Sequence, residues 1–152
     1  MRLAEYFVNA HDPKALTVRQ VMEDAVFTVS PETKGITLAE MMTDRNFGSV
    51  PIVKDDSTLV GLVSEFDLLR AIDEGKDLRQ ITAQEIMTRD VVTVTEEMLV
   101  KDLINLLQNR HLIRTPVVRG TTLIGIVSRR DAVFGYVKAT AHYWWPGKGV
   151  SG

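Results

Sequence analysis

The chain carries the same ordered pattern twice, and this duplication constrains its fold more than any other feature. The segment Thr17–Met22 (TVRQVM) aligns with Thr82–Met87 (TAQEIM), an offset of 82 − 17 = 65 residues. The alignment continues through Val29 with Val94, Leu38 with Leu103, Arg45 with Arg110, Pro51 with Pro116 and Val53 with Val118. The order of the matched residues is the same in both copies, which indicates a tandem duplication.

One residue is lost after this stretch, where KDDST in the first copy meets RGTT in the second. At an offset of 64 residues, Gly61–Ser64 (GLVS) then aligns with Gly125–Ser128 (GIVS), and Asp67 aligns with Asp131. Each copy therefore ends its apolar strand on a Ser that is followed three residues later by an Asp.

Each copy is predicted to form a short helical turn and then a β-α-β-β-α unit. The strands are expected at Val26–Val29, Val50–Val53 and Leu59–Val63 in the first copy, and at Val91–Val94, Pro116–Val118 and Leu123–Val127 in the second. The helices are expected at Thr37–Asn46 and Ser64–Ile72, and at Leu99–Arg110 and Ser128–Thr140. The expected fold class is α/β (α+β), with helices covering apolar sheets.

We divide the chain into an N-terminal helical extension (1–16), a first repeat (17–75), a second repeat (76–140) and an aromatic tail (141–152). One copy alone would leave apolar sheet and helix faces in water. We therefore expect the two copies to pack sheet against sheet, with a shared core and pseudo-twofold symmetry.

The overall composition narrows the range of functions. The 152 residues include 18 basic and 20 acidic side chains, giving a net charge of −2, so there is no global basic field to attract nucleic acid. There are no cysteines, which excludes disulfides and thiolate metal sites. His11, His111 and His142 are scattered and predict no metal site. With no signal peptide or membrane span visible, we expect a cytoplasmic protein.

The Ser–Asp pairs are the residues with the clearest binding chemistry. Ser64 and Ser128 stand where a strand ends and a helix begins, so free backbone N–H groups and the positive end of the helix dipole favour a phosphate there. Asp67 and Asp131 offer two acceptor oxygens each, which suits the two hydroxyls of a ribose. The same Ser-x-x-Asp pattern also resembles a capping box, which requires no ligand, and the two interpretations are compatible.

The two copies differ in charge around these pairs. Arg129 and Arg130 follow Ser128, whereas Glu65 and Phe66 follow Ser64. Two residues before the second Pro stands Arg114, whose counterpart is Ser49. Guanidinium groups bind phosphate in a fork geometry, so the second copy is predicted to bind a phosphorylated ligand more tightly. The sequence does not assign Arg114 to one particular cleft.

The strings IMTRDVVTV, TPVV and LIGIVSRRD, with their first-copy counterparts VMEDAVFTV, VPIV and LVGLVSEFD, resemble the CBS (cystathionine-beta-synthase) domain. The resemblance covers about residues 17–140. It implies a CBS pair, or Bateman module, with clefts between the two sheets. It also implies a regulatory adenine-containing ligand, AMP, ADP, ATP or S-adenosylmethionine, and homodimers of pairs.

The candidate ligand-binding residues follow from the duplicated pattern. In the second repeat they are Val91, Val92, Thr93, Arg114, Thr115, Pro116, Ser128, Arg129, Arg130 and Asp131. In the first repeat, where binding is expected to be weaker, they are Val26, Phe27, Thr28, Ser49, Val50, Pro51, Ser64 and Asp67. Val26–Thr28 and Val91–Thr93 would supply amides and apolar walls to an adenine, although inward-facing members of such strands can equally be plain core.

Two segments lie outside the repeats. Met1–Ala10 could form a short amphipathic helix through Leu3, Tyr6, Phe7 and Ala10. The tail carries Tyr143, Trp144 and Trp145, which are costly to leave in water, and Pro146 prevents a helix there. We expect the tail to dock on the module or at a subunit contact; base stacking is the alternative, but flanking positive charge is lacking.

The leading functional hypothesis is a non-enzymatic module that senses an adenosyl ligand, needs no obligatory cofactor and signals to an unknown effector protein. The alternative is a structural dimerisation module with clefts that bind nothing. An enzyme or a nucleic-acid binder is the third class, disfavoured because no P-loop and no nucleophile with a nearby base can be recognised. We expect a homodimer that packs through the helices after Ser64 and Ser128, with Leu68, Leu69, Val133 and Phe134 as its apolar residues. The alternative is that these residues belong to the core of their own chain.

Overall fold

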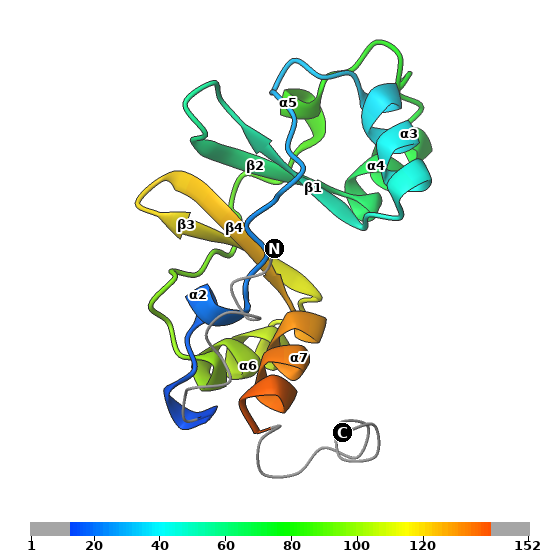
Figure 1. The fold of residues 1–152 in the computed structure, drawn as a ribbon. Coiled ribbons are helices and arrows are strands. Elements are labelled where there is room, and N and C mark those ends of the chain that lie inside the picture. Colours follow the sequence, from blue (N-terminus) through cyan, green and yellow to red (C-terminus); the bar gives the residue numbers. More distant parts are fainter. Residues whose placement is uncertain (1–12, 141–152) are drawn as a thin grey trace. The chain divides into compact units, whose positions relative to one another are not determined.

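The computed structural model describes residues 13–140, and these residues fall into two compact units (Figure 1). Within the described range, unit 1 consists of residues 13–26, Thr93–Arg119 and 124–140, and unit 2 consists of Phe27–Val92 and Gly120–Leu123. The extension Met1–Ala10, the aromatic tail, His11 and His142 lie outside the described residues.

Unit 2 is built around the antiparallel hairpin β1 (Ser49–Val53) and β2 (Leu59–Ser64). Its helices are α3 (Gly35–Arg45), α4 (Glu65–Asp73) and the short α5 (Ala83–Ile86). Its buried core consists of Leu38, Met42, Val50, Ile52, Val63, Leu68, Ala71, Ala83 and Ile86. Three consecutive residues of β1, Val50, Pro51 and Ile52, are buried between its half-buried ends, and since successive side chains of a strand point to opposite faces, both faces of β1 are covered.

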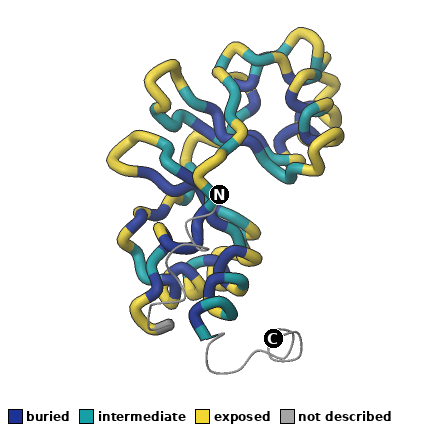
Figure 2. Tube along the Cα trace, viewed as in Figure 1, coloured by how far each residue is buried: buried dark blue, intermediate teal, exposed yellow. Residues whose placement is uncertain are grey.

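Unit 1 repeats this plan. Its hairpin consists of β3 (Arg114–Arg119) and β4 (Thr122–Ser128), and the residues around the turn of this hairpin, Gly120–Leu123, belong to unit 2. Its helices are α6 (Val100–Asn109), α7 (Arg129–Thr140) and the short α2 (Val18–Val21). The 3-10 turn η2 (Pro13–Ala15) precedes α2. Its core contains Leu16, Val18, Val21, Met22, Val94, Val100, Leu103, Leu107, Val117, Val127, Ala132 and Ala139. Figure 2 shows the buried residues of these elements in dark blue.

The compact units do not coincide with the sequence repeats, because the short first helices are exchanged. Helix α2 opens the first repeat in sequence but lies in unit 1, against α7 of the second repeat. Helix α5 opens the second repeat but lies in unit 2, against α4 and β2. Each unit therefore combines the short helix of one repeat with the hairpin and long helices of the other.

The backbone repeats in detail. Helix α3 ends on Asn46 in the left-handed region with φ of 57°, and the corresponding residue after α6, His111, has φ of 53°. A left-handed residue directly after a helix lets the backbone N–H groups that follow bond to the last carbonyl groups of the helix, and it changes the direction of the chain. His111 therefore has a structural place at the end of a helix, and among the described residues no group of three or more His, Cys, Asp or Glu could hold a metal ion.

The α/β fold class predicted from the sequence is confirmed, and so are the four long helices and the two hairpins, within a few residues at their ends. The predicted strands Val26–Val29 and Val91–Val94 are wrong. Only Val29 and Val94 pair, each through one isolated parallel bridge, to Ile52 and Val117. The chain turns directly after these residues, where Thr33 N–H donates to Ser30 O (3.1 Å) and Met98 N–H to Thr95 O (3.3 Å). The residues before them, 26–28 and 91–93, form no bridge to a neighbouring strand. The sheet-to-sheet packing of the two copies stays a prediction.

Candidate functional site

The strand-to-helix junction of unit 2 brings together several residues predicted from the sequence. Ser49 pairs directly with Ser64 across the β1–β2 ladder, so the start of one strand and the end of the other lie side by side. Glu65 N–H donates to Gly48 O at 3.2 Å and closes this corner. Asp67 follows in the first turn of α4 and is only 3% exposed.

Ser64 and Asp67 form a complete capping box. The Ser64 N–H donates to Asp67 Oδ2 at 2.8 Å, and the Asp67 N–H donates to Ser64 Oγ at 3.3 Å. These bonds satisfy backbone donors that the start of a helix leaves unpaired. The interpretation of the Ser-x-x-Asp pattern as a capping box is therefore correct at this junction. The Asp67 carboxylate already stabilises the start of α4, so a ligand that contacts it would have to do so alongside this role.

Asp67 has two further partners that sequence reasoning missed. The Thr88 hydroxyl donates to Asp67 Oδ1 at 3.2 Å, and the Arg70 guanidinium donates to the same oxygen at 3.4 Å. Thr88 is brought there by two backbone hydrogen bonds with Leu62, at 2.9 and 2.8 Å. The repeat alignment shows that the two junctions differ at this position. The residue that follows Met87 is Thr88, whereas the residue that follows Met22 is Glu23.

The segment before β1 supplies an aromatic surface to unit 2. The rings of Phe27 and Phe47 lie 5.9 Å apart, and the Arg45 guanidinium lies 4.8 Å from the centre of the Phe27 ring. Val29 runs parallel to β1, with its N–H donating to Pro51 O at 3.2 Å, which carries Thr28 toward Val50 and Pro51. Arg45 was noted in the sequence only as a repeated residue, so this cation–π contact is new.

The junction of unit 1 follows the same design. Ser128 N–H donates to Asp131 Oδ2 at 2.9 Å, and Asp131 N–H donates to Ser128 Oγ at 3.0 Å. Arg129 N–H donates to Ile113 O at 2.9 Å, which places the start of β3, and with it Arg114, beside the start of α7. Asp131 is 3% exposed, the same as Asp67.

Most candidates of the second repeat lie in unit 1. Thr115 and Pro116 are buried in β3, Arg114 is half-buried, Arg129 and Arg130 are exposed, and Thr93 belongs to the same unit. Val91 and Val92 are counted with unit 2, and Val26 with unit 1. The structure therefore assembles each Ser–Asp pair with its neighbouring strand, and it divides the two predicted adenine-lining segments between the units.

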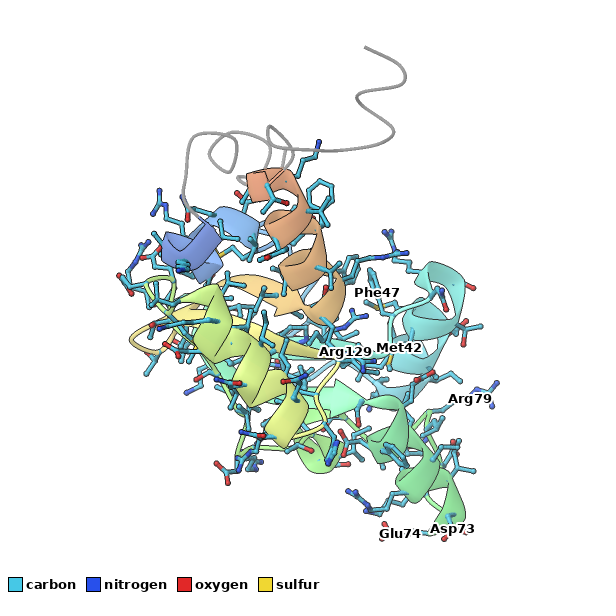
Figure 3. All side chains as sticks on the ribbon, turned by 90° about the horizontal axis from the view of Figure 1, so that it is seen from below. Met42, Phe47, Asp73, Glu74, Arg79 and Arg129 are labelled. Atoms are coloured by element: carbon cyan, nitrogen blue, oxygen red, sulfur yellow. The ribbon has the colours of Figure 1, made fainter. Side chains whose placement is uncertain are left out.

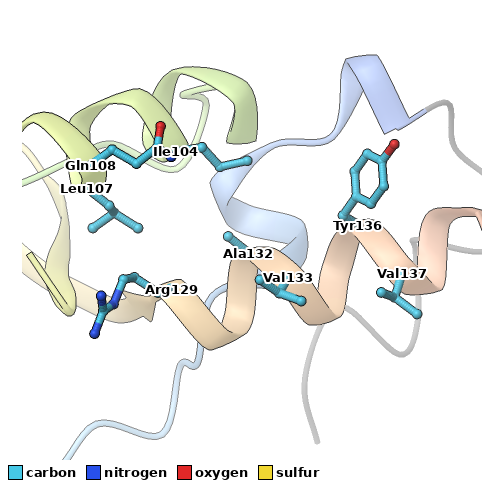
Figure 4. Close-up of a pocket in the computed structure, with 8 residues that line it drawn as sticks. All are labelled: Ile104, Leu107, Gln108, Arg129, Ala132, Val133, Tyr136 and Val137. Atoms are coloured by element: carbon cyan, nitrogen blue, oxygen red, sulfur yellow. The ribbon is translucent and has the colours of Figure 1, made fainter.

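An apolar groove lies beside this junction in unit 1, between α6 and α7 (Figure 4). Its volume is about 440 Å³. It is lined by Ile104, Leu107, Gln108, Arg129, Ala132, Val133, Tyr136 and Val137. Arg129, one of the three predicted phosphate ligands, therefore also contributes to the wall of this groove.

One cluster of charged side chains lies away from the junctions in unit 1. Arg119 donates twice to Glu96 Oε1, at 3.0 and 2.8 Å, and Arg19 donates to Glu96 Oε2 at 3.2 Å. The hydrogen bond from Arg119 holds the pKa of Glu96 below its ordinary value, and partial burial opposes this only in part. The cluster ties α2 to the second repeat. Within residues 13–140, no helix has the length and apolar character needed to cross a bilayer.

Comparison with known proteins identifies the duplicated unit. The CBS domain family model matches twice, at residues 18–74 and 83–137. An uncharacterised protein of Methanopyrus kandleri is 32% identical over 120 residues, which cover 78% of this chain and 61% of that protein, so the chain spans less than two thirds of this relative.

Two solved structures share the fold. CBSX2, crystallised in complex with AMP, is 28% identical with a TM-score of 0.73, covering 81% of this chain and 97% of that one. A CBS domain pair in complex with 5-methylthioadenosine and S-adenosyl-L-methionine is 25% identical with a TM-score of 0.68, covering 78% of this chain and 97% of that one. The two family matches together cover more than half of the sequence, so this chain belongs to the CBS domain family, as a tandem pair of CBS domains.

Proposed function

We propose that this chain is a regulatory module that binds an adenosine-containing ligand, AMP, ADP, ATP or S-adenosylmethionine, and catalyses no reaction. The observation that carries the proposal is the repeated junction, in which a buried carboxylate stands one turn into a helix, three residues after a Ser at the end of a strand. Relatives of the same fold are solved in complex with AMP and with S-adenosyl-L-methionine, which supports an adenosyl ligand.

The chemistry of each group assigns its role in the proposal. Asp67 and Asp131 accept hydrogen bonds from ribose hydroxyls, because an ionised carboxylate only accepts. The hydroxyls of Ser64 and Ser128, at the starts of α4 and α7, face the phosphate, which the helix dipole favours. Arg114, Arg129 and Arg130 add positive charge in the second repeat. The adenine would lie against the residues 26–28 or 91–93.

The hydrogen bonds already present set a condition on binding. Asp67 accepts from Ser64, Thr88 and Arg70, so a ribose must share or displace these donors. Displacing them has a cost, because a buried donor left without a partner loses about 1–3 kcal/mol. A similar condition applies at Asp131, whose Oδ2 accepts from the Ser128 N–H.

The module is also proposed to form a homodimer through α4 and α7, the helices after Ser64 and Ser128, on which Leu69 and Val133 are exposed. Helix α4 exposes Phe66 (77%), Leu69 (60%) and Ile72, three and six residues apart on one stripe. Leu68, named from the sequence as a dimer residue, is instead buried in the core of unit 2, and Phe134 is half-buried in unit 1. A dimer that covers the stripe would pass a ligand signal to an effector chain. Light scattering tests this, and a monomeric mass would contradict it.

Isothermal titration calorimetry with AMP, ADP, ATP and S-adenosylmethionine tests the ligand proposal, with GMP and GTP as controls for the base. We expect heat of binding from at least one adenosine ligand and a raised unfolding temperature. A ligand that binds only the folded state adds about 2.7 kcal/mol of stability at 100 times its dissociation constant. If no adenosine ligand binds a dimeric protein, the chain is a structural dimerisation module with clefts that bind nothing.

A further inference from the structure

Strand β4 has a different neighbour on each of its two edges. Along one edge it pairs with β3 in the hairpin. On the other edge Ile126 exchanges two backbone hydrogen bonds with Glu23, at 2.8 and 2.9 Å. Because the N–H and C=O groups of one strand residue point to the same edge, Glu23 lies on the edge of β4 opposite β3.

The two sides of the unit 1 junction carry opposite charges. Arg114 begins β3, and Arg129 and Arg130 begin α7. Figure 3 shows Arg129 at the start of this helix, where its N–H donates to Ile113 O on the β3 side at 2.9 Å. Glu23 brings a carboxylate from the opposite edge of β4. The junction is therefore flanked by positive side chains of β3 and α7 and by a negative side chain across from β3.

Unit 2 shows what a side chain at the position of Glu23 reaches. Thr88 exchanges the same two backbone hydrogen bonds with Leu62, at 2.9 and 2.8 Å, and in both units the Met that precedes this position packs against the Gly of the strand. The Thr88 hydroxyl lies 3.2 Å from Asp67 Oδ1. Since the backbone is the same, the side chain of Glu23 leaves the chain beside Asp131.

This position lies between the buried carboxylate and solvent. Asp67 and Asp131 are each 3% exposed, whereas Thr88 is exposed and Glu23 is half-buried. A ligand that reaches either Asp from solvent therefore passes the side chain at position 88 or 23. A Glu carboxylate repels a phosphate group at short range, and a Thr side chain carries no charge.

The chemistry of ribose recognition gives this charge a consequence. In dinucleotide-binding folds a carboxylate beside the ribose accepts hydrogen bonds from its free hydroxyls, and an Arg nearby accommodates a ribose phosphate. With Asp131 on the ribose, a second carboxylate from Glu23 makes a phosphate on the 2′ or 3′ oxygen unfavourable. The arginines of β3 and α7 favour phosphate at the 5′ end.

From these observations we propose that Glu23 is a specificity-determining residue, which restricts the unit 1 junction to adenosine phosphates that carry their charge on the 5′ side and keep both ribose hydroxyls free. The junction of unit 2 has the neutral Ser49 and Thr88 on the two edges of β2 and lacks this carboxylate. The inference rests on the proposed function and adds the class of ligand that the junction refuses.

Two ligands with the same number of phosphates test the proposal. ADP carries both phosphates at the 5′ end, and adenosine 3′,5′-bisphosphate carries one at each end. Isothermal titration calorimetry of the full chain measures the affinity of the tighter site for each. We expect a preference for ADP of about thirtyfold or more, and we expect Glu23→Gln to reduce it by about fivefold or more, which corresponds to about 1 kcal/mol. Glu23→Arg should reduce it further, because a guanidinium binds phosphate.

Asp24→Asn is the matched control. Asp24 is the exposed neighbour of Glu23, and its replacement changes the net charge of the chain by the same amount as Glu23→Gln. We expect this variant to keep the preference for ADP. The preference is a ratio of two affinities, so a general loss of affinity cancels, and thermal unfolding shows whether each variant is folded.

Equal affinity of the full chain for the two ligands would overturn the proposal. A preference that Glu23→Gln leaves unchanged would also overturn it, since Asp131 alone or the junction of unit 2 would then set the preference. An equal fall in Asp24→Asn would assign the effect to net charge. Binding of S-adenosylmethionine without ADP would remove this inference and leave the proposed function standing, whereas a chain that binds no adenosine ligand would remove both.

Discussion

Units 1 and 2 attach their short helices with the same backbone hydrogen bonds and with different side chains. Arg19 N–H donates to Glu96 O and Gln84 N–H donates to Pro31 O, both at 3.0 Å and at corresponding positions. In unit 1 the side chains add an ionic cluster around Glu96. In unit 2 the counterpart of Glu96 is Pro31, which can form no ion pair.

The same contrast occurs at the two Ser–Asp junctions. Glu23 exchanges two backbone hydrogen bonds with Ile126, at 2.8 and 2.9 Å, as Thr88 does with Leu62. The Thr88 hydroxyl can donate a hydrogen bond to the Asp67 carboxylate. Glu23, the counterpart of Thr88, carries a carboxylate, which only accepts hydrogen bonds when it is ionised. The duplication has thus preserved the backbone while the side chains diverged, so differences in ligand binding between the repeats must originate in side chains.

The largest effect is expected from the carboxylates proposed to bind ribose. Asp131→Ala should lower the affinity for a phosphorylated adenosine by tenfold or more, because hydrogen bonds to charged groups contribute on the order of 1.5–3 kcal/mol. Asp67→Ala should lower it less. Calorimetry measures both affinities, and thermal unfolding shows whether each variant is folded.

This pair of variants controls for the capping role, which the two Asp residues share, since a lost cap costs about 1 kcal/mol of stability at either junction. If Asp67→Ala abolishes binding and Asp131→Ala leaves it intact, the first repeat holds the working site and the argument from the arginines is wrong.

The second prediction concerns the contact between α7 and α2 in unit 1. An added Cβ at Gly135 would collide with Val21 Cγ1 and lie 3.1 Å from Val21 Cβ. Overpacking of this kind costs about 1–3 kcal/mol, and the gain in helix propensity of Ala over Gly offsets up to about 1 kcal/mol. Gly135→Ala should therefore lower the free energy of unfolding measured in urea.

Ala71 provides the comparison for this variant, because it occupies the position in α4 that corresponds to Gly135 and already carries a Cβ in the core of unit 2. Ala71→Gly should cost at least about 1 kcal/mol, because it lowers helix propensity and removes a buried methyl group. Equal or higher stability of Gly135→Ala would mean that α2 adjusts its position at little cost.

The third prediction concerns the hydroxyl that holds Asp67. Thr88→Val removes the donor and keeps the shape of the side chain, so unfolding in urea should require about 1 kcal/mol less free energy. Thr88→Ser keeps the hydroxyl and should retain most of the stability. If Val and Ser variants are equally stable, the hydrogen bond to Asp67 contributes nothing.

The smallest effect is expected from Glu96, because its arginine partners are more than half exposed and such pairs contribute about 0.2–1 kcal/mol. Contacts with Arg119 and Arg19 lower the pKa of Glu96 in the folded state, so their stabilisation is present above the ordinary value of 4.5 and is lost as the pH falls through the lower folded value. Glu96→Gln should flatten the dependence of unfolding temperature on pH below about 4.5. An unchanged slope would show that other carboxylates govern acid stability.

Much of the fold followed from the sequence because apolar periodicity and the internal repeat reinforce each other. The hairpins and long helices were placed within a few residues. The strands at Val26–Val29 and Val91–Val94 were not, because apolar β-branched residues indicate extended chain and do not tell whether a second strand runs alongside. The exchange of α2 and α5 was equally invisible, since periodicity carries no information on which hairpin a short helix joins.

The local contacts of the candidate site were predictable from the sequence, and its long-range contacts were not. Ser64, Asp67, Ser128 and Asp131 are linked by local hydrogen bonds over three residues, which sequence spacing can indicate. Thr88 lies 21 residues from Asp67, and its contact depends on the backbone bonds to Leu62, which spacing does not show. The distribution of the predicted adenine-lining segments between the units also depends on long-range contacts.

The exchange of the short helices separates the unit of duplication from the unit of folding. A gene segment that encodes one repeat supplies α2 without the hairpin it packs on, or a hairpin without its α5. An ancestral single repeat would thus have had to borrow a helix from a second molecule, as domain-swapped dimers do. Joining two copies in one chain made that borrowing intramolecular, and cutting the chain between residues 75 and 76 should return it to a concentration-dependent association of two fragments.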